Sequence, residues 1–318
     1  MVTGRFAPSP SGRVHIGNLF TSLLAWLSAK KRGGRVILRI EDLDTRRCTA
    51  AYAQQLQDDL LWLGLTWDEG PLIGGTHAPY EQSKRTALYR DALERLRALG
   101  LVYPCFCTRA ELHAADAPHR SDGQTVYAGM CQNLTAAEVA ERAAKRPPAY
   151  RLRVPDEVIT VHDGHMGTYS EQLRRDCGDF LLQRSDGLYA YQLAVVVDDA
   201  DMGVTEVVRG SDLLSSTPRQ LLLYRLLGLT PPTFCHVPLL LSQDGRRLSK
   251  RDHDLNLSVL RTRYTPEAVL GKLAYLAGIH PTAEPVRVTD LLAAFDWCAV
   301  PVQDIIVPEN LFHQAGGL

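Results

Sequence analysis

The N-terminal segment constrains the fold of this 318-residue chain more than any other stretch. Residues 3–18 read TGRFAPSPSGRVHIGN, in which a strand-like run breaks at two prolines and passes through Ser11 and Gly12 into an amphipathic helix. The start of such a helix carries unpaired backbone N–H groups and the positive end of the helix dipole, which together bind phosphate. The segment therefore predicts a strand, a turn and a helix, with a phosphate site at the turn.

Alternating strands and helices follow this unit. We predict strands at 3–7 and 36–40, helices at 16–31, 49–63 and 82–99, strand-like residues at 150–162, strand or helix at 179–183 and 189–197, strands at 204–208 and 233–241, and helices at 266–276 and 288–295. This alternation favours an α/β fold with a Rossmann-like parallel sheet and helices on both faces.

The composition is that of an ordinary globular protein, with 45% hydrophobic residues, 22% charged residues and a net charge of −1. No apolar run is long enough to span a bilayer, and the N-terminus lacks a charged-then-apolar leader. Seven cysteines, an odd number in a long chain, argue against a secreted disulfide scaffold. We expect a cytoplasmic, monomeric protein without a membrane partner. Contacts to RNA would depend on local basic runs such as 30–32, 246–247 and 250–251.

A second motif lies far downstream, where residues 242–252 read SQDGRRLSKRD. Together with His15-Ile16-Gly17-Asn18 it resembles the HIGH and KMSKS signatures of class I aminoacyl-tRNA synthetases, with Asn18 in place of the second histidine. The resemblance implies Mg²⁺-ATP bound by Gly12, His15, Gly17, Asn18, Arg247, Leu248, Ser249, Lys250 and Arg251. Of these, His15, Asn18, Ser249 and Lys250 would be catalytic, because they can stabilise charge on the phosphates during adenylate formation.

The flanking blocks narrow this resemblance. The segments RFAPSPSG (5–12), LRIEDLDTRR (38–47), EVVRGSDLLSSTPRQ (206–220) and HVPLLL (236–241) resemble glutamyl-tRNA synthetases and not their glutaminyl relatives. The resemblance implies an L-glutamate pocket made by Arg5, Phe6, Ala7, Pro8, Ser9, Glu41, Tyr191 and Arg209. Arginines suit the substrate carboxylates and Glu41 its ammonium group. The alternatives are a helix cap or a surface salt bridge for Glu41 and plain core packing for Tyr191.

Three cysteines lie at metal-ligand spacing: Cys105, Cys107 and Cys131. Free buried cysteines are the alternative to a zinc site. The candidates for a fourth ligand are His113, His119 and Tyr127, and chemistry alone favours a histidine. The resemblance favours Tyr127, since a short paralogue of the glutamyl family carries a tyrosine four residues before its last cysteine. The Zn²⁺ ion would then be structural.

The same resemblance implies four regions: 1–102, the first half of the catalytic domain; 103–175, a zinc-bearing insertion facing the acceptor; 176–255, the second half with the KMSKS-like loop; and 256–318, a short helical tail. Residues 252–318 are too few for the anticodon-binding domain of a glutamyl-tRNA synthetase. The chain thus resembles the glutamyl-Q tRNA(Asp) synthetase family, which transfers glutamate to queuosine in the anticodon loop of tRNA(Asp). A fragment that charges a tRNA 3′ end and a non-catalytic paralogue that binds glutamate or RNA are the competing hypotheses.

Overall fold

A computed structural model describes residues 1–108, 110–111, 126–248 and 255–312 of the chain. The strands are β1 (Thr3–Phe6), β2 (Arg35–Leu38), β3 (Val102–Cys105), β4 (Ala149–Leu152), β5 (Val158–Asp163), β6 (Gly167–Gln172), β7 (Phe180–Gln183), β8 (Glu206–Gly210), β9 (Thr233–Val237), β10 (Leu240–Leu241) and β11 (Ile305–Ile306). The helices are α1 (Ile16–Lys31), α2 (Ala50–Trp62), α3 (Thr86–Ala98), α5 (Ala136–Lys145), α6 (Tyr191–Asp201), α7 (Thr217–Leu226), α8 (Leu257–Arg263), α9 (Pro266–Leu276) and α10 (Val288–Ala294).

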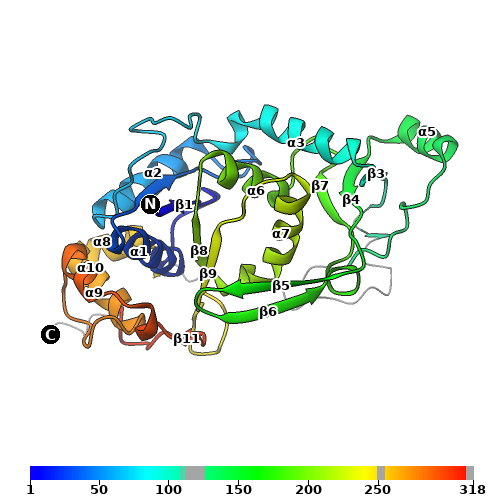
Figure 1. Cartoon of the computed structure of the whole chain (residues 1–318). Helices are drawn as coiled ribbons and strands as arrows, with labels where there is room; N and C mark the ends of the chain where they lie inside the picture. The colour runs from blue at the N-terminus through cyan, green and yellow to red at the C-terminus, as the bar shows by residue number, and fades with distance from the viewer. Residues whose placement is uncertain (109, 112–125, 249–254, 313–318) are drawn as a thin grey trace.

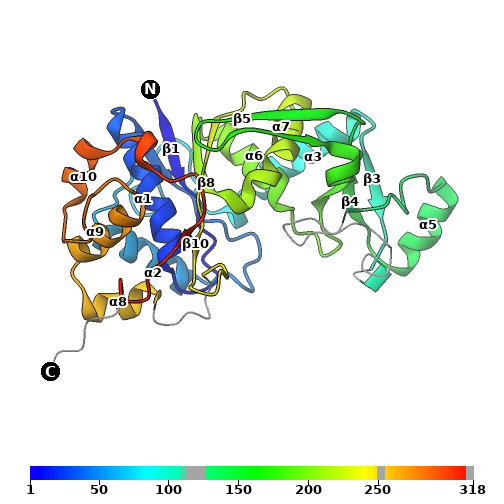
Figure 2. The same ribbon diagram turned by 90° about the horizontal axis from the view of Figure 1, so that it is seen from below.

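The centre of the molecule is built from parallel strands. Strand β1 pairs with β2, and β8 pairs with β9. The two pairs meet at β1 and β8, where the Thr205 N–H donates to the Thr3 carbonyl at 2.9 Å. Figures 1 and 2 show these strands between two groups of helices. The predicted mixed α/β architecture with parallel strands is therefore confirmed, although these strands form two hydrogen-bonded pairs and not one continuous ladder.

Alternate residues of the central strands belong to two separate cores. Leu38 and Val208 pack with α1 and the C-terminal helices. Ile37 and Val207 pack with α3, α6 and α7 on the opposite side. Because successive side chains of a strand point to opposite faces, this division means that helices cover both faces of the parallel strands.

The segment after α3 forms antiparallel structure. Strand β4 pairs with both β3 and β7, and β5 and β6 form a hairpin. This hairpin runs beneath α6 and α7 in Figure 1 and returns to the central strands, where the Gly164 N–H donates to the Phe234 carbonyl of β9 at 2.7 Å. The antiparallel sheet includes β7, which lies beyond residue 175, the end of the insertion that the sequence predicts.

The C-terminal helices α8, α9 and α10 pack against α1 at one end of the molecule, while α5 lies at the other end (Figure 2). The Lys31 ammonium donates to the Ala293 carbonyl at 2.7 Å, and the Leu257 N–H donates to the Val14 carbonyl at 3.0 Å. The predicted helices at 16–31 and 266–276 have the observed bounds. Helices α5 and α7 were not predicted, and α8 lies within the predicted helical tail at 256–318.

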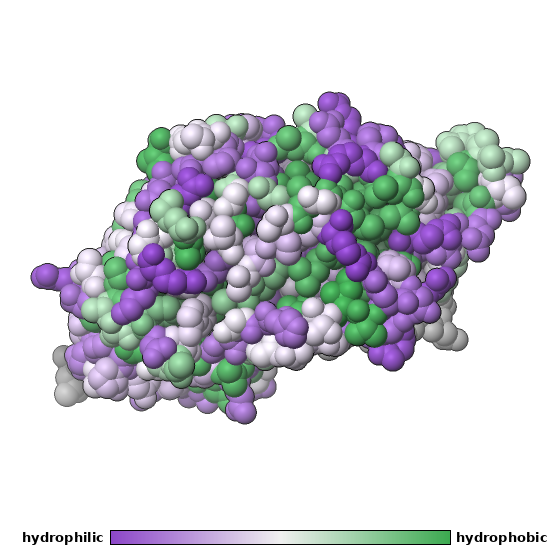
Figure 3. All heavy atoms as spheres, in the orientation of Figure 1, coloured by the Kyte–Doolittle hydropathy of each residue, from purple (hydrophilic) through white to green (hydrophobic). Residues whose placement is uncertain are grey.

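On the face drawn in Figure 3, hydrophilic and hydrophobic side chains are interspersed along the whole length of the molecule. Within the described ranges, every helix is too short or too polar to cross a membrane.

Candidate active site

A cavity of about 460 Å³ opens at the turn between β1 and α1. It is also lined by residues from the segment after β2, the end of β8, the start of α6 and the segment after β10. Its lining includes these residues predicted from the sequence: Arg5, Phe6, Ala7, Pro8, Ser9, Gly12, His15, Gly17, Asn18, Glu41, Tyr191, Arg209, Arg247 and Leu248. Ser249, Lys250 and Arg251 lie outside the described residues. The structure thus brings together the described members of two predicted sites that are far apart in the sequence.

His15 caps the helix that faces this cavity. Its Nδ1 accepts a hydrogen bond from the Gly17 N–H at 3.2 Å, and the Asn18 side chain accepts from the His15 N–H at 3.5 Å, which completes a capping box. Since Nδ1 is an acceptor, the neutral ring carries its proton on Nε2. A side chain at position 17 would place its Cβ 3.1 Å from the ring, so a larger residue there would require the ring to shift by a few tenths of an ångström.

Arg5 and Glu41 are buried beside a network of charged side chains. The Arg5 guanidinium donates to the Val208 carbonyl at 3.0 Å and lies 3.7 Å from Asp199. Arg39 is fully buried and bonds both Glu41, at 3.1 Å, and Asp199, at 2.6 Å. Burial raises the pKa of Glu41, although the neighbouring Arg39 and Arg5 oppose that shift. Glu41 is therefore neither a surface salt bridge nor a helix cap. It is a buried carboxylate whose negative charge is balanced by Arg39 and Arg5.

Arg209 lines the cavity and is held by hydrogen bonds to several neighbours. From β8, its guanidinium donates to Gln220 and Thr217 on α7 at 2.8 Å each and to the His236 ring of β9 at 2.9 Å. It also contacts the Leu213 carbonyl at 3.3 Å. These contacts fix the direction of a buried positive charge, which suits binding of a carboxylate. Tyr191 is only partly buried and lines the same cavity, so it is not merely a core residue.

Arg247, from the downstream motif at 242–252, also lines the cavity. Its guanidinium pairs with Asp212, which follows β8. The neighbouring Leu248 is buried in the core with α1 and β10. This pairing attaches the described start of the predicted loop to the wall that carries Arg209.

Several residues that line the cavity were not predicted from the sequence: Ser11, Arg13, Val14, Thr21, Ser22, Ala25, Leu56, Val208, Gly210, Asp212, Leu213, Pro238, Leu239 and Leu240. Many of them adjoin predicted residues in the sequence. Including the next helical turn or the neighbouring strand residues of each motif would have identified them. Of the predicted basic runs, Lys30 pairs with Asp68 and Arg246 with Asp244, so neither forms an isolated positive charge.

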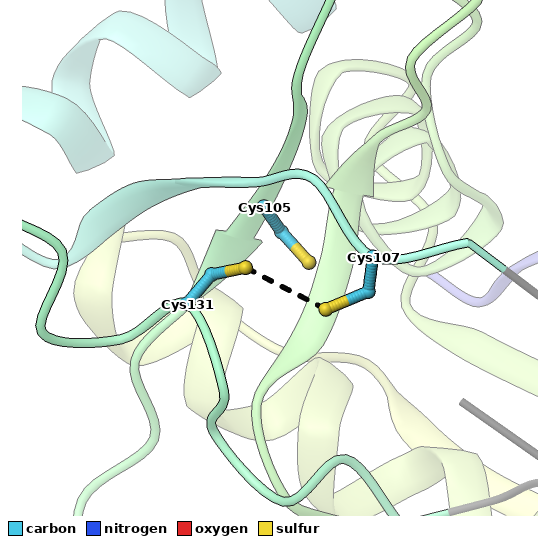
Figure 4. Close-up of side chains that lie close together, drawn as sticks. All are labelled: Cys105, Cys107 and Cys131. Carbon is cyan, nitrogen blue, oxygen red and sulfur yellow. Dashed lines mark hydrogen bonds between the residues drawn. The ribbon is translucent and has the colours of Figure 1, made fainter. Parts of the chain in front are cut away.

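The three cysteines predicted to bind metal lie together near β3. Figure 4 shows their side chains pointing toward one another, and their sulfur atoms lie within 4.8 Å of each other. The Cys107 and Cys131 sulfurs are 3.5 Å apart. The Tyr127 hydroxyl lies 3.5 Å from the Cys105 sulfur and 3.6 Å from the Cys107 sulfur. His113 and His119 lie outside the described residues.

This donor set fits a tetrahedral zinc ion. With ordinary zinc–sulfur and zinc–oxygen distances, neighbouring sulfurs would lie about 3.8 Å apart and a sulfur and an oxygen about 3.5 Å apart. Arg151 donates to the Cys105 sulfur at 3.3 Å and lies over the Tyr127 ring at 3.8 Å. Three thiolates carry more negative charge than one Zn²⁺ can balance, and Arg151 supplies a compensating positive charge. The cluster can therefore hold zinc.

Comparison with known proteins identifies the family. A model described as the catalytic domain of class I tRNA synthetases (E and Q) matches residues 1–296. The chain belongs to this family. The resemblance predicted from the two motifs and their flanks is thus confirmed, and with it the class of enzyme, a ligase.

Two similar proteins match the chain from end to end, and both are named glutamyl-Q tRNA(Asp) synthetase. The protein from Symbiobacterium thermophilum is 51% identical, covering 100% of this chain and 99% of its own length. The protein from Nitratidesulfovibrio vulgaris is 49% identical, covering 99% and 98%. A glutamate tRNA ligase from Elizabethkingia meningosepticum, solved with its amino acid, has a TM-score of 0.84 at 30% identity over 98% of this chain and 68% of its own.

Proposed function

We propose that this chain activates L-glutamate with ATP and transfers the glutamyl group to the queuosine base in the anticodon loop of tRNA(Asp). The observation that carries the proposal is the end-to-end similarity, at 51% and 49% identity, to two proteins named for this activity. The cavity supports the proposal because it gathers two buried arginines, a buried carboxylate and a capped helix N-terminus, which suit an amino acid with two carboxylates beside a nucleotide.

In the first step a carboxylate oxygen of glutamate attacks the α-phosphorus of ATP, and pyrophosphate leaves. Arg5 and Arg209 bind the two substrate carboxylates, and Glu41 accepts from the ammonium group. Mg²⁺ enters with ATP and offsets its charge. Because the arginines and Glu41 are held by their own partners, the substrate is oriented by groups that need not reorganise.

His15 and Asn18 stabilise the phosphates during this step. The cap leaves the His15 Nε2–H as the ring donor, and a donor at a helix N-terminus is well suited to charge developing on a phosphate oxygen. We assign the same role to Ser249 and Lys250. Gly12, Gly17, Arg247, Leu248 and Arg251 complete the ATP site.

In the second step a hydroxyl of the acceptor attacks the carbonyl carbon of glutamyl-adenylate. An ester bond forms, the bond to the phosphate breaks and AMP leaves. Because the adenylate is already a reactive mixed anhydride, the step depends on positioning more than on a nucleophilic side chain.

We further propose that residues 103–175 form an insertion that faces the acceptor and that residues 256–318 form a helical tail supporting the catalytic domain, which comprises 1–102 and 176–255. One Zn²⁺, held by Cys105, Cys107, Tyr127 and Cys131, would fix the loops of the insertion and take no part in the chemistry. We expect the protein to act as a cytoplasmic monomer.

The acceptor is tested by transfer of labelled glutamate to total tRNA from cells with and without queuosine. We expect label only on the queuosine-containing tRNA and on tRNA(Asp) within it. Nuclease cleavage of the labelled tRNA is the control, because label on the 3′-terminal fragment instead of the anticodon fragment would identify a glutamyl-tRNA synthetase fragment. Equal labelling of both preparations would overturn the queuosine assignment.

Activation is tested separately by glutamate-dependent exchange of pyrophosphate into ATP, with and without tRNA. Exchange is expected with glutamate and not with glutamine. Absence of exchange with all substrates present would overturn the proposed catalysis and favour a binding protein.

A further inference from the structure

A chain of buried polar side chains links the candidate glutamate site to the β5–β6 hairpin. His236 on β9 is the direct neighbour of Arg209 on β8 in the parallel register. Its Nε2 lies 2.9 Å from the Arg209 Nε, and its Nδ1 lies 2.6 Å from a carboxylate oxygen of Asp163 at the end of β5. The side chains of His236 and Asp163 are completely buried.

The hydrogen-bond partners of His236 determine which of its two ring nitrogens carries the proton. The Arg209 Nε always carries a proton, so the His236 Nε2 that faces it must be an unprotonated acceptor. The ring proton then sits on Nδ1 and is donated to Asp163. Burial lowers the pKa of His236, which agrees with a neutral ring. Thr217 also lies 3.4 Å from Nε2 and can donate to it.

Asp163 is held in place by backbone groups on two sides. Its Oδ1 accepts from the N–H groups of His165 at 3.0 Å, Met166 at 2.8 Å and His236 at 3.0 Å. Its Oδ2 accepts from the His236 ring and, at 3.2 Å, from the His236 N–H. The hairpin turn thus presents one carboxylate oxygen to the histidine in a fixed direction.

We propose that Asp163 and His236 are positioning residues for glutamate: Asp163 fixes the tautomer of His236, and His236 then holds Arg209 in the direction that binds the substrate carboxylate. The inference rests on the proposed function, in which Arg209 binds glutamate. It gives the β5–β6 hairpin a part in amino-acid binding, although its residues come from the region assigned to the insertion and to acceptor contacts.

The Asp163→Asn variant tests the tautomer. Three backbone donors hold the Oδ1 position, so the amide oxygen will occupy it and the NH₂ group will face His236. That group must donate to Nδ1, which moves the ring proton to Nε2. The Nε2–H and the Arg209 N–H are then two donors facing each other, so the hydrogen bond between them is lost. We expect the KM for glutamate in pyrophosphate exchange to rise on the order of 10- to 100-fold, with kcat and the KM for ATP little changed.

Two further variants separate positioning from general damage to the fold. In His236→Gln the amide oxygen can replace Nε2 as the acceptor for Arg209, so its KM for glutamate should stay within about fivefold of the wild-type value. His165→Gln is the matched control, because His165 lies in the same turn and contacts the Pro301 carbonyl at 3.0 Å instead of His236. Its KM for glutamate should be unchanged.

The outcomes distinguish this inference from the proposed function. If the wild-type protein shows no glutamate-dependent exchange, the proposed function fails. If it shows exchange and a folded Asp163→Asn variant keeps the wild-type KM for glutamate, the inference alone is overturned. Should that variant fail to fold, ¹⁵N NMR of the wild-type His236 ring decides, because a proton on Nε2 would contradict the proposed tautomer.

Discussion

At the scale of single residues, His15 uses its two ring nitrogens differently. Nδ1 accepts a hydrogen bond in the helix cap, and the neutral ring then carries its proton on Nε2. In the proposed function, His15 would combine this structural bond with donation to a phosphate oxygen.

We predict that His15→Ala lowers kcat for glutamate-dependent pyrophosphate exchange by about 10²–10³-fold, the usual cost of losing one donor to a charge that develops in the transition state. Loss of the cap should cost about 1 kcal/mol of stability, so the variant should remain folded. His162→Ala is the control, because His162 is exposed on β5 and does not line the cavity. Equal rates for both variants would contradict the role assigned to His15.

The sequence predicts residues that lie within a motif and misses those that act through another residue. Arg5, Glu41 and Arg209 stand in recognisable blocks, and the structure places them around one cavity. His236 also stands in such a block, yet nothing local marks it, because its partner Asp163 is distant in the sequence. Contacts of that kind depend on how β5 and β9 meet, and only the structure supplies that information.

At the scale of elements, burial on all sides hides helical periodicity. The run 189–197 could be strand or helix from its sequence, and it forms most of α6, where Leu193 to Asp199 are all buried. Helix α7 was missed for the same reason, since its polar residues Arg219 and Gln220 are also buried. In contrast, α1 has a cap, an apolar side and a basic last turn, and its predicted bounds agree with the structure.

The contact between β2 and α6 depends on the buried Arg39, which bonds Asp199 at 2.6 Å and lies 3.8 Å from Asp198. We predict that Arg39→Met lowers the free energy of unfolding by about 3–5 kcal/mol, because it removes a buried cation that is hydrogen-bonded to both Asp199 and Glu41. Urea unfolding measures this loss. Arg175→Met is the control, since its exposed pair with Asp176 should contribute little. Equal losses in the two variants would argue against the network as a stabilising element.

The cysteine cluster lies beside β3, and zinc binding tests its proposed fourth ligand. We predict one zinc ion per chain and, for Tyr127→Phe, an affinity lower by at least about tenfold, measured by competition with a chelator. Tyr150→Phe should bind zinc normally, because the Tyr150 ring packs under Arg97 away from the cluster. Wild-type affinity in Tyr127→Phe would instead favour a histidine, as donor chemistry alone suggested.

At the scale of the whole molecule, the candidate site is assembled from both halves of the chain. The turn after β1, the segment after β2, the end of β8 and Arg247 all contribute to it, while the β5–β6 hairpin supports it through Asp163. The fold class followed from the alternation of strands and helices. The way in which the antiparallel hairpin meets the parallel strands did not follow from it, because no periodic pattern encodes that contact.

The buried pair of His236 and Asp163 should make the free energy of unfolding depend on pH. Burial lowers the pKa of His236, so below its ordinary value of about 6.5 the unfolded chain binds a proton that the folded chain excludes, and stability falls as the pH decreases. One such group contributes a slope of at most about 1.4 kcal/mol per pH unit. Hydrogen bonds hold the pKa of Asp163 down against the effect of burial, so its contribution is lost only at more acidic pH. We predict that the stability advantage of the wild-type protein over His236→Gln shrinks between about pH 7.5 and pH 5.5 in urea unfolding. An advantage that is constant over this range would show that His236 titrates equally in the folded and unfolded chains.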